Sequence, residues 1–389
     1  MCRPPLAPVL LLLLSTPPFA RAETPPAIPV TLKAPDGIAL KATYYSPGRE
    51  GPGILLLHQC NRDRASWAAL AAQAAARGYH VLALDYRGYG ESEGQRSENL
   101  QEQQQLVADK WPGDVDAAFT WLTAQKDVDR NRIAAAGASC GVNQALLLAR
   151  RHPEVKTVVL LSGNARPEAR EHLRNSPGMP VFAAASLDDG NVVSSMKWIL
   201  GWSQNEQNRF TEFEAAGHGT DMFAVEKGLQ SMILEWFDGK LRAAPAVLPK
   251  PSSSPPPTAV EKFWTLLAQP GGVENARSMF DASRQSDPGL VLFPEGEMNL
   301  HGYSLLQDGN TKDAILVFQM NVEAYPQSAN THDSLSDAHL AAGNRDEALR
   351  LAEKALAVLA TDKQATGEFG ALIRESAEKK VKELRRKLQ

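Results

Sequence analysis

Residues 133–141 read Ile-Ala-Ala-Ala-Gly-Ala-Ser-Cys-Gly, an apolar run that ends in a Gly-x-Ser-x-Gly motif centred on Ser139. Residues 144–151, which follow the motif, have the composition of a helix. A serine between a strand and a helix lies on a sharp turn that points its hydroxyl away from the sheet. The flanking glycines suit this turn because strand and helix backbones crowd it. The motif therefore predicts that Ser139 is a nucleophile.

Strands and helices alternate through the surrounding 210 or so residues, from Val30 to Asp238. The expected strands are residues 30–33, 38–45, 54–57, 81–84, 133–136, 158–161, 181–185 and 210–213. The expected helices are residues 66–77, 114–121, 144–151 and 224–237. Continuous apolar runs are typical of strands buried on both faces. The alternation predicts a doubly wound α/β domain with a mostly parallel sheet.

The overall composition indicates two domains and an exported protein. A chain of 389 residues suits two domains, and its formal net charge of −4 gives no sign of a nucleic-acid-binding surface. Arg3 precedes an apolar run at residues 6–14, and Ala20-Arg21-Ala22 is a small-x-small site. This order predicts a signal peptide at residues 1–22 and a periplasmic or secreted protein. The run is shorter than the roughly 20 residues that span a membrane, so no transmembrane segment is expected.

A Pro- and Ser-rich stretch, residues 243–258, divides the rest of the chain into an α/β part, residues 23–242, and a C-terminal part, residues 259–389. The stretch contains prolines at positions 245, 249, 251, 255, 256 and 257. Such a composition cannot build a core and favours extended conformations, so we expect a linker. The C-terminal part is expected to be all helical.

The C-terminal part contains an internal repeat. Residues 309–314 (Gly-Asn-Thr-Lys-Asp-Ala) are echoed by residues 343–348 (Gly-Asn-Arg-Asp-Glu-Ala), an offset of 34 residues. The region resembles tetratricopeptide repeats over about two units, because 34 residues is their period. The consensus positions filled in the first unit are Gly302, Ala314, Phe318 and Pro326. The resemblance implies a surface for a protein partner, although the repeats can instead be a stabilising or dimerising appendage.

A serine nucleophile needs a base, and the base needs an orienting carboxylate. After Ser139 the α/β part contains His152, His172 and His218. His152 lies at the end of an expected helix and His172 in a charged stretch, whereas His218 directly follows the last expected strand. His218 is therefore the expected base.

The α/β part resembles the α/β-hydrolase superfamily, in which the triad follows the chain order Ser, Asp or Glu, His. Residues 85–92 (Asp-Tyr-Arg-Gly-Tyr-Gly-Glu-Ser) also match an Asp-x-Arg-Gly-x-Gly-x-Ser turn of that superfamily, and the nearest subgroup is the dienelactone-hydrolase-like enzymes. The resemblance implies a serine hydrolase that forms an acyl-enzyme and cleaves a small ester substrate. No cofactor is implied, and the chain has no metal-binding motif. The alternatives are a peptidase on the same fold, and a repeat-based binding protein with an idle hydrolase domain.

The triad acid is expected in the loop after residues 181–185. Both Asp188 and Asp189 can lie at the carboxyl end of this strand. Members of the superfamily often carry Asp-x-x-Val here, which fits Asp189 because Val192 follows three residues later. We therefore expect Asp189 as the acid and Asp188 as a loop-capping carboxylate, with the opposite assignment as the alternative.

The resemblance also implies an oxyanion hole of two backbone N–H groups. One belongs to Cys140, and position favours Cys60 for the other, although His58-Gln59 replaces the usual His-Gly. Two donors about 3 Å from one oxygen lie at most about 6 Å apart, so their Cα atoms can fall within disulfide range. Cys60 and Cys140 are the only cysteines after residue 22, and we expect them to form a disulfide. The alternative is two buried thiols.

Overall fold

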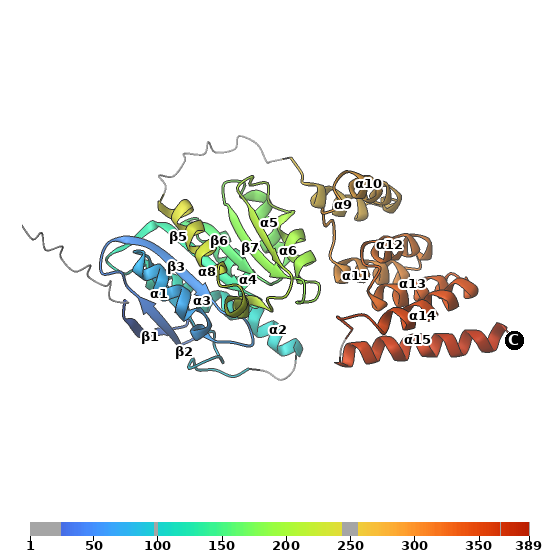
Figure 1. The fold of residues 1–389 in the computed structure, drawn as a ribbon, viewed down its shortest axis with the longest axis horizontal. Coiled ribbons are helices and arrows are strands. Elements are labelled where there is room, and N and C mark those ends of the chain that lie inside the picture. The colour runs from blue at the N-terminus through green and yellow to red at the C-terminus, as the bar shows by residue number, and fades with distance from the viewer. Residues whose placement is uncertain (1–24, 97–99, 243–255, 366, 389) are drawn as a thin grey trace, which may run out of the picture.

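The computed structural model describes residues 25–96, 100–242, 256–365 and 367–388. The predicted signal peptide and residues 243–255 of the predicted linker lie outside the described residues. The described chain forms an α/β part and an all-helical part (Figure 1).

Eight strands form one sheet in the order β1-β2-β4-β3-β5-β6-β7-β8. β2 is antiparallel to both its neighbours, and every pair from β4 to β8 is parallel. The strands are β1 (Ala27–Lys33), β2 (Ala39–Tyr45), β3 (Gly51–Leu57), β4 (His80–Leu84), β5 (Val128–Ala138), β6 (Val155–Leu161), β7 (Val181–Ser186) and β8 (Arg209–Phe213). This arrangement confirms the predicted α/β-hydrolase fold.

Helices cover both faces of the sheet (Figure 1). They are α1 (Ala68–Ala76), α2 (Leu100–Asp109), α3 (Trp111–Thr123), α4 (Cys140–Arg151), α5 (Pro167–Asn175), α6 (Val192–Leu200), α7 (Met222–Val225) and α8 (Leu229–Phe237), with short helical turns η1 (Arg64–Trp67), η2 (Gly219–Asp221) and η3 (Asp238–Arg242). Leu55 and Leu57 belong to the core cluster on the face covered by α3 to α6, whereas Ile54 and Leu56 belong to the cluster on the face covered by α1 and α8. β3 is therefore buried on both faces, as its continuous apolar run predicts.

Four helical segments differ from the sequence predictions, and one of them is α2, which was not predicted. The single helix expected at residues 224–237 is wrong, because Glu226 leaves the helical region and splits it into α7 and α8. Helix α5 was also not predicted, because only Ala169 and Leu173 are buried in an otherwise polar and charged segment. Helix α6 was not predicted either, because Val-Val-Ser-Ser-Met-Lys-Trp-Ile-Leu is mostly apolar and begins with two β-branched residues, which favour strands.

The C-terminal part is all helical, as predicted. Its helices are α9 (Ala259–Leu267), α10 (Val273–Ser286), α11 (Glu295–Gln307), α12 (Thr311–Ala324), α13 (Ala329–Ala341), α14 (Arg345–Leu359) and α15 (Gly367–Leu388). α11 and α13 begin 34 residues apart, as do α12 and α14. Gly302 packs on the ring of Phe318, since a Cβ there would lie 2.6 Å from ring carbons. At the corresponding positions of the second helix pair stand Ser336 and Ala352, and the Ser336 hydroxyl donates to the Ala348 carbonyl at 2.7 Å.

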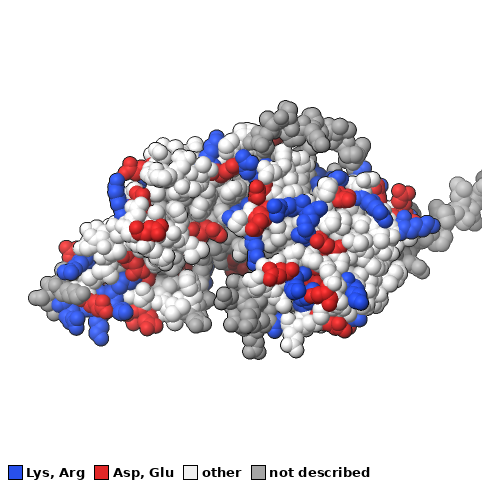
Figure 2. All heavy atoms as spheres, turned by 180° about the vertical axis from the view of Figure 1, so that it is seen from behind, with Lys and Arg blue, Asp and Glu red and all other residues white. Residues whose placement is uncertain are grey.

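The surface and the helix lengths bear on possible partners. On the face of the molecule shown in Figure 2, Lys and Arg side chains are interspersed with Asp and Glu side chains over both parts. Among the described residues, no helix combines the length and the apolar character needed to cross a membrane.

Candidate active site

Ser139 lies at the turn between β5 and α4 in a backbone conformation that side chains rarely adopt, with φ 52° and ψ −118°. Both glycines of the motif are required by close backbone contacts. A Cβ at Gly137 would lie 2.1 Å from the Gly141 carbonyl oxygen, and one at Gly141 would lie 2.4 Å from the Leu57 carbonyl oxygen. The sequence therefore maintains a strained turn with Ser139 at its apex, which is typical of functional sites.

Gly163, the second residue after β6, also contacts this turn. A Cβ at Gly163 would lie 2.4 Å from the Ser139 carbonyl oxygen, so only glycine allows the chain after β6 to pass this close to the serine turn. The sequence analysis missed this residue, for which the only signal was a Ser-Gly pair directly after the apolar strand.

His218 and Asp189 are brought together from two loops at the same edge of the sheet. His218 follows β8, and its Nδ1 atom lies 2.6 Å from Oδ2 of Asp189, which follows β7. The hydrogen bond to Asp189 raises the pKa of the His218 imidazole, because a carboxylate stabilises the charged ring. The pair has the geometry of a general base and its orienting carboxylate.

Asp188 has different partners from Asp189. It accepts hydrogen bonds from the Ser186 hydroxyl and from the backbone N–H of Gly217, at 3.1 Å in the second case. The hydrogen bond from Ser186 lowers the pKa of Asp188. Asp188 thus links the loop after β7 to the loop that carries His218, whereas Asp189 contacts the imidazole itself.

The His218 loop packs beside the serine turn. A Cβ at Gly219 would lie 3.4 Å from Cβ of Ala138, the residue before Ser139. Among the described residues, the Ser139 hydroxyl has no hydrogen-bond partner within 3.5 Å, so a bond between Ser139 and His218 is not formed. Such bonds are often long without substrate and shorten in the Michaelis complex.

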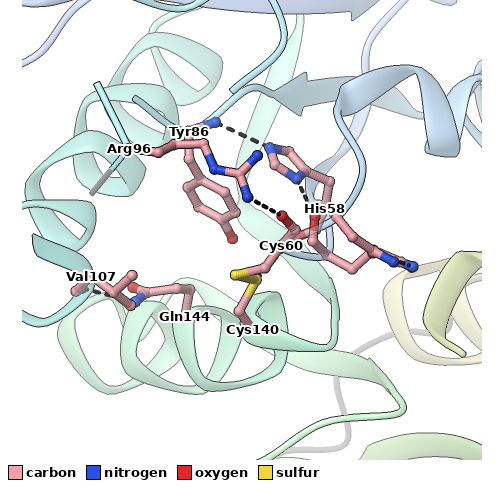
Figure 3. The surroundings of a disulfide bond; sticks show 9 residues. His58, Cys60, Tyr86, Arg96, Val107, Cys140 and Gln144 are labelled. Atoms are coloured by element: carbon pink, nitrogen blue, oxygen red, sulfur yellow. Dashed lines mark hydrogen bonds between the residues drawn. A yellow bond between two sulfur atoms is a disulfide. The ribbon is translucent and has the colours of Figure 1, made fainter. Parts of the chain in front are cut away.

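A disulfide joins Cys60, in the loop after β3, to Cys140, the first residue of α4 (Figure 3). Their Cα atoms are 5.8 Å apart, and the bond closes a sequence separation of 80 residues. The Arg96 guanidinium donates to the Cys60 carbonyl at 3.5 Å and lies over the Tyr89 ring. The two residues that the sequence suggests as oxyanion donors are therefore fixed relative to each other.

Hydrogen bonds of His58 and Gln59 hold the loop after β3 in place. His58 is buried, its Nε2 accepts the Tyr86 N–H at 3.2 Å, and its Nδ1 lies 2.7 Å from the Gln59 carbonyl. The ring proton must therefore lie on Nδ1. Burial lowers the pKa of His58, so the ring is neutral and has a structural role in this loop. The Gln59 amide oxygen accepts from the N–H and hydroxyl of Thr220, at 2.7 and 2.9 Å, which ties the loop to the turn after His218.

The two other histidines that follow Ser139 in the α/β part lie elsewhere. His152 ends α4 and contacts Asp116 at 2.9 Å, and α4 has 12 residues, so it lies about 18 Å along the helix from Ser139. His172 lies in α5, where burial lowers its pKa and Ser176 is 3.3 Å from its Nδ1.

Known proteins resemble the α/β part. Residues 36–208 match the sequence model of the X-Pro dipeptidyl-peptidase (S15) family. An uncharacterized protein of Mycobacterium tuberculosis is 36% identical over 144 residues, which cover 36% of this chain and 48% of that relative. An uncharacterized 31.7 kDa protein of Escherichia coli is 28% identical over 128 residues, 33% of this chain and 42% of its own length. The chain thus spans about half or less of the curated relatives it matches.

Solved structures resemble the same part. An esterase of Pyrococcus furiosus has a TM-score of 0.45 at 18% identity and covers 56% of this chain and 92% of its own. A dienelactone hydrolase from Anabaena variabilis has a TM-score of 0.44 at 21% identity and covers 56% of this chain and 100% of its own. At these identities the likeness concerns the fold alone. The family match covers the central strands of the mostly parallel sheet, from β3 to β7.

Proposed function

We propose that the protein is a serine hydrolase that cleaves carboxylic ester-type bonds through Ser139, His218 and Asp189. The observation that carries the proposal is the strained serine turn beside a histidine whose Nδ1 lies 2.6 Å from an aspartate. These are the parts of a nucleophile, base and orienter arrangement.

In the proposed reaction, His218 takes the proton of Ser139 as Oγ attacks the acyl carbon. Asp189 stabilises the imidazolium that forms. The imidazolium then gives its proton to the leaving alcohol, and an acyl-enzyme remains on Ser139. Water, deprotonated by His218, attacks this ester, and the carboxylic acid leaves as Ser139 regains its proton.

The backbone N–H groups of Cys140 and Cys60 are proposed to bind the oxyanion of both tetrahedral intermediates. Preorganised donors of this kind stabilise charge that develops in the transition state. The disulfide supports this role because it holds the two residues 5.8 Å apart between their Cα atoms before substrate arrives.

A small or exposed acyl group suits the site. Only residues 162–180 connect β6 and β7, and they contain the single nine-residue helix α5, which is too short for a large cap. We therefore propose short-chain esters as the first substrates to test.

The direct test is hydrolysis of p-nitrophenyl acetate by the full chain and by Ser139→Ala. The variant is expected to lose at least 10³-fold in kcat/KM, because no other group supplies the nucleophile. Ser304→Ala, an exposed serine of α11, is the matched control and should keep wild-type activity. Full activity in Ser139→Ala would refute the proposal.

A peptidase is the second candidate, and the S15 family match favours it. That match includes Ser139 and Asp189 but ends at residue 208, before His218. A comparison of Ala-Pro-p-nitroanilide with p-nitrophenyl acetate separates the candidates. A higher kcat/KM on the dipeptide substrate, abolished in Ser139→Ala, would replace the esterase assignment with a peptidase.

We also propose export, and a protein partner for the helical part. A disulfide is the form expected in an oxidising compartment, which supports export. Fractionation of cells that produce the tagged chain tests this, with an exported protein that starts at Glu23 as the expected result. The 34-residue spacing of the helix pairs supports a partner-binding role, which cross-linking of the exported chain tests.

A further inference from the structure

Several side-chain contacts join the helical part to the α/β part. Val260 of α9 is fully buried within the core cluster that contains α5 and α6. A Cβ at Gly201, just after α6, would lie 2.5 Å from Cγ2 of Val260. Trp264 of α9 packs edge-on against Trp198 of α6, with ring centroids 6.1 Å apart. The two parts are therefore joined by side-chain contacts as well as by the covalent chain.

One contact of this interface reaches the loop that carries Asp189. Glu295, the first residue of α11, is only 5% exposed. Its Oε2 accepts a hydrogen bond from Nδ2 of Asn191 in the α/β part, at 3.2 Å. Its Oε1 accepts from the Ser328 hydroxyl at 3.0 Å and from the Asn330 amide at 2.9 Å. The carboxylate thus joins α11 and the start of α13 to the acid loop.

Asn191 lies two residues after Asp189 and caps the N-terminus of α6. Its side chain makes no capping bond to its own helix, and its amide donates to Glu295. The next residue, Val192, donates its N–H back to the Asp189 carbonyl at 3.3 Å. The position of Asn191 therefore restricts the backbone conformation of the loop that follows Asp189. A carboxylate near the N-terminus of α6 is also favoured by the helix dipole.

A second residue of the helical part holds the first turn of α6. The Tyr325 hydroxyl contacts the Ser194 side chain and donates to the Phe293 carbonyl at 2.6 Å. Burial raises the pKa of Tyr325, so the hydroxyl stays a neutral donor. Contacts from two helical elements thus fix the helix that begins at the acid loop.

We infer that Glu295 is a positioning residue for the proposed reaction, which holds the Asp189 loop through Asn191. This inference rests on the proposed role of Asp189. Loss of the Glu295 charge weakens the hydrogen bonds from three partly buried donors and loosens the attachment of the loop after Asp189, because hydrogen bonds to a charged group are stronger than those to a neutral one. The helical part thereby sets how well Asp189 orients His218.

The test uses the full chain with Glu295→Gln and Asn191→Ala, and with Glu375→Gln as the control. Glu375 is exposed on α15, so its variant makes the same charge change away from the interface. Active sites are counted with a fluorophosphonate label, and kcat, KM and their pH dependence are measured on p-nitrophenyl acetate. Both interface variants are expected to lose about tenfold in kcat per labelled site with little change in KM, the size of one hydrogen bond.

The pH profile separates positioning from a merely structural role. The carboxylates that act on His218 are Asp189 and, more weakly, Asp221. A displaced Asp189 raises the imidazole pKa less, so the acid limb of kcat/KM should move to lower pH in both interface variants. The double variant should be no worse than the poorer single variant, because the two residues act through one contact.

The outcomes distinguish this inference from the proposed function. An active Ser139→Ala variant would refute the function itself. If activity depends on Ser139 but both interface variants keep the wild-type kcat per site and acid limb, the inference is wrong. A lower melting temperature with an unmoved acid limb and an unchanged kcat per site would also overturn it, because it assigns Glu295 to stability alone.

Discussion

The Gln59 amide oxygen lies 2.7 Å from the backbone nitrogen of Thr220 and 2.9 Å from its hydroxyl. Gln59 precedes Cys60, and Thr220 follows His218 by two residues, so this buried side chain joins the proposed oxyanion loop to the proposed base. A Cβ at Gly219 would lie 2.2 Å from the same amide oxygen, which shows how closely the two loops pack.

Replacing Gln59 with leucine is expected to lower activity. The variant keeps the side-chain size but leaves the Thr220 N–H unpaired, which costs about 1–3 kcal/mol. We expect kcat/KM on p-nitrophenyl acetate to fall at least tenfold. Gln73→Leu, on the exposed face of α1, is the control. Equal activity of the two variants would show that Gln59 has no positioning role.

Breaking the Cys60–Cys140 disulfide should affect both stability and rate. The bond closes a sequence separation of 80 residues, and loss of such a bond typically costs about 2–4 kcal/mol. The double variant Cys60→Ser/Cys140→Ser is expected to unfold at lower urea concentration and to lose kcat more than KM. Mass spectrometry of unreduced tryptic peptides should find the two cysteines linked, and two free thiols would contradict this part of the account.

The two aspartates after β7 should respond differently to substitution by asparagine. Asp189→Asn removes the carboxylate bonded to His218, so we expect a loss of about 10³–10⁴ in kcat. Asp188→Asn changes only the contacts to Ser186 and Gly217, so its loss should be tenfold or less. A larger loss in Asp188→Asn would reverse the assignment of the acid.

The pH dependence of the reaction follows from the same hydrogen bond. His218 must be neutral to act as a base, and Asp189 raises its pKa. Activity should therefore fall as the pH drops through a pKa above the ordinary histidine value. In Asp189→Asn this acid limb should move to lower pH. An acid limb at the same pH in both proteins would show that another group controls it.

Arg87 is expected to be important for stability. Its Nε and Nη2 atoms donate to the fully buried Asp114 at 2.7 and 2.5 Å, and its Nη1 atom donates to Asp36 at 2.7 Å. Arg87→Met leaves the Asp114 carboxylate buried without its cation, which costs about 3–5 kcal/mol. Arg132→Met, which breaks a more exposed pair with Asp129, should cost at most about 1 kcal/mol in the same urea titration.

The stability deficit of Arg87→Met should depend on pH. Burial raises the pKa of Asp114, and without Arg87 the folded protein binds a proton more readily than the unfolded chain. The deficit should therefore be smaller at pH 5 than at pH 8. A deficit that grows on acidification would contradict the assignment of this network.

The α/β fold could be predicted because its strands are short apolar runs, as in residues 54–57, that are buried on both faces. The serine turn was equally clear, since Gly137 and Gly141 leave no room for a side chain. The choice between Asp188 and Asp189 could not be made from residue type, because both follow the same strand. It depends on which carboxylate points to the imidazole and which to the Gly217 N–H.

Contacts between distant segments account for what the sequence analysis missed. The bond from Asn191 to Glu295 spans 104 residues, and that from Gln59 to Thr220 spans 161. Neither has a periodicity or motif that marks it. Similarly, Val260 follows the predicted linker by two residues yet lies in the core of the α/β part, which no local pattern indicates.

The central claim is that Ser139 forms an acyl-enzyme. Reaction of the purified chain with a fluorophosphonate, followed by peptide mass spectrometry, tests it most directly. The account predicts one adduct per chain on the peptide that contains Ser139, and slower labelling in His218→Ala. No labelling of Ser139, or equal labelling of Ser139 and exposed serines, would contradict the account.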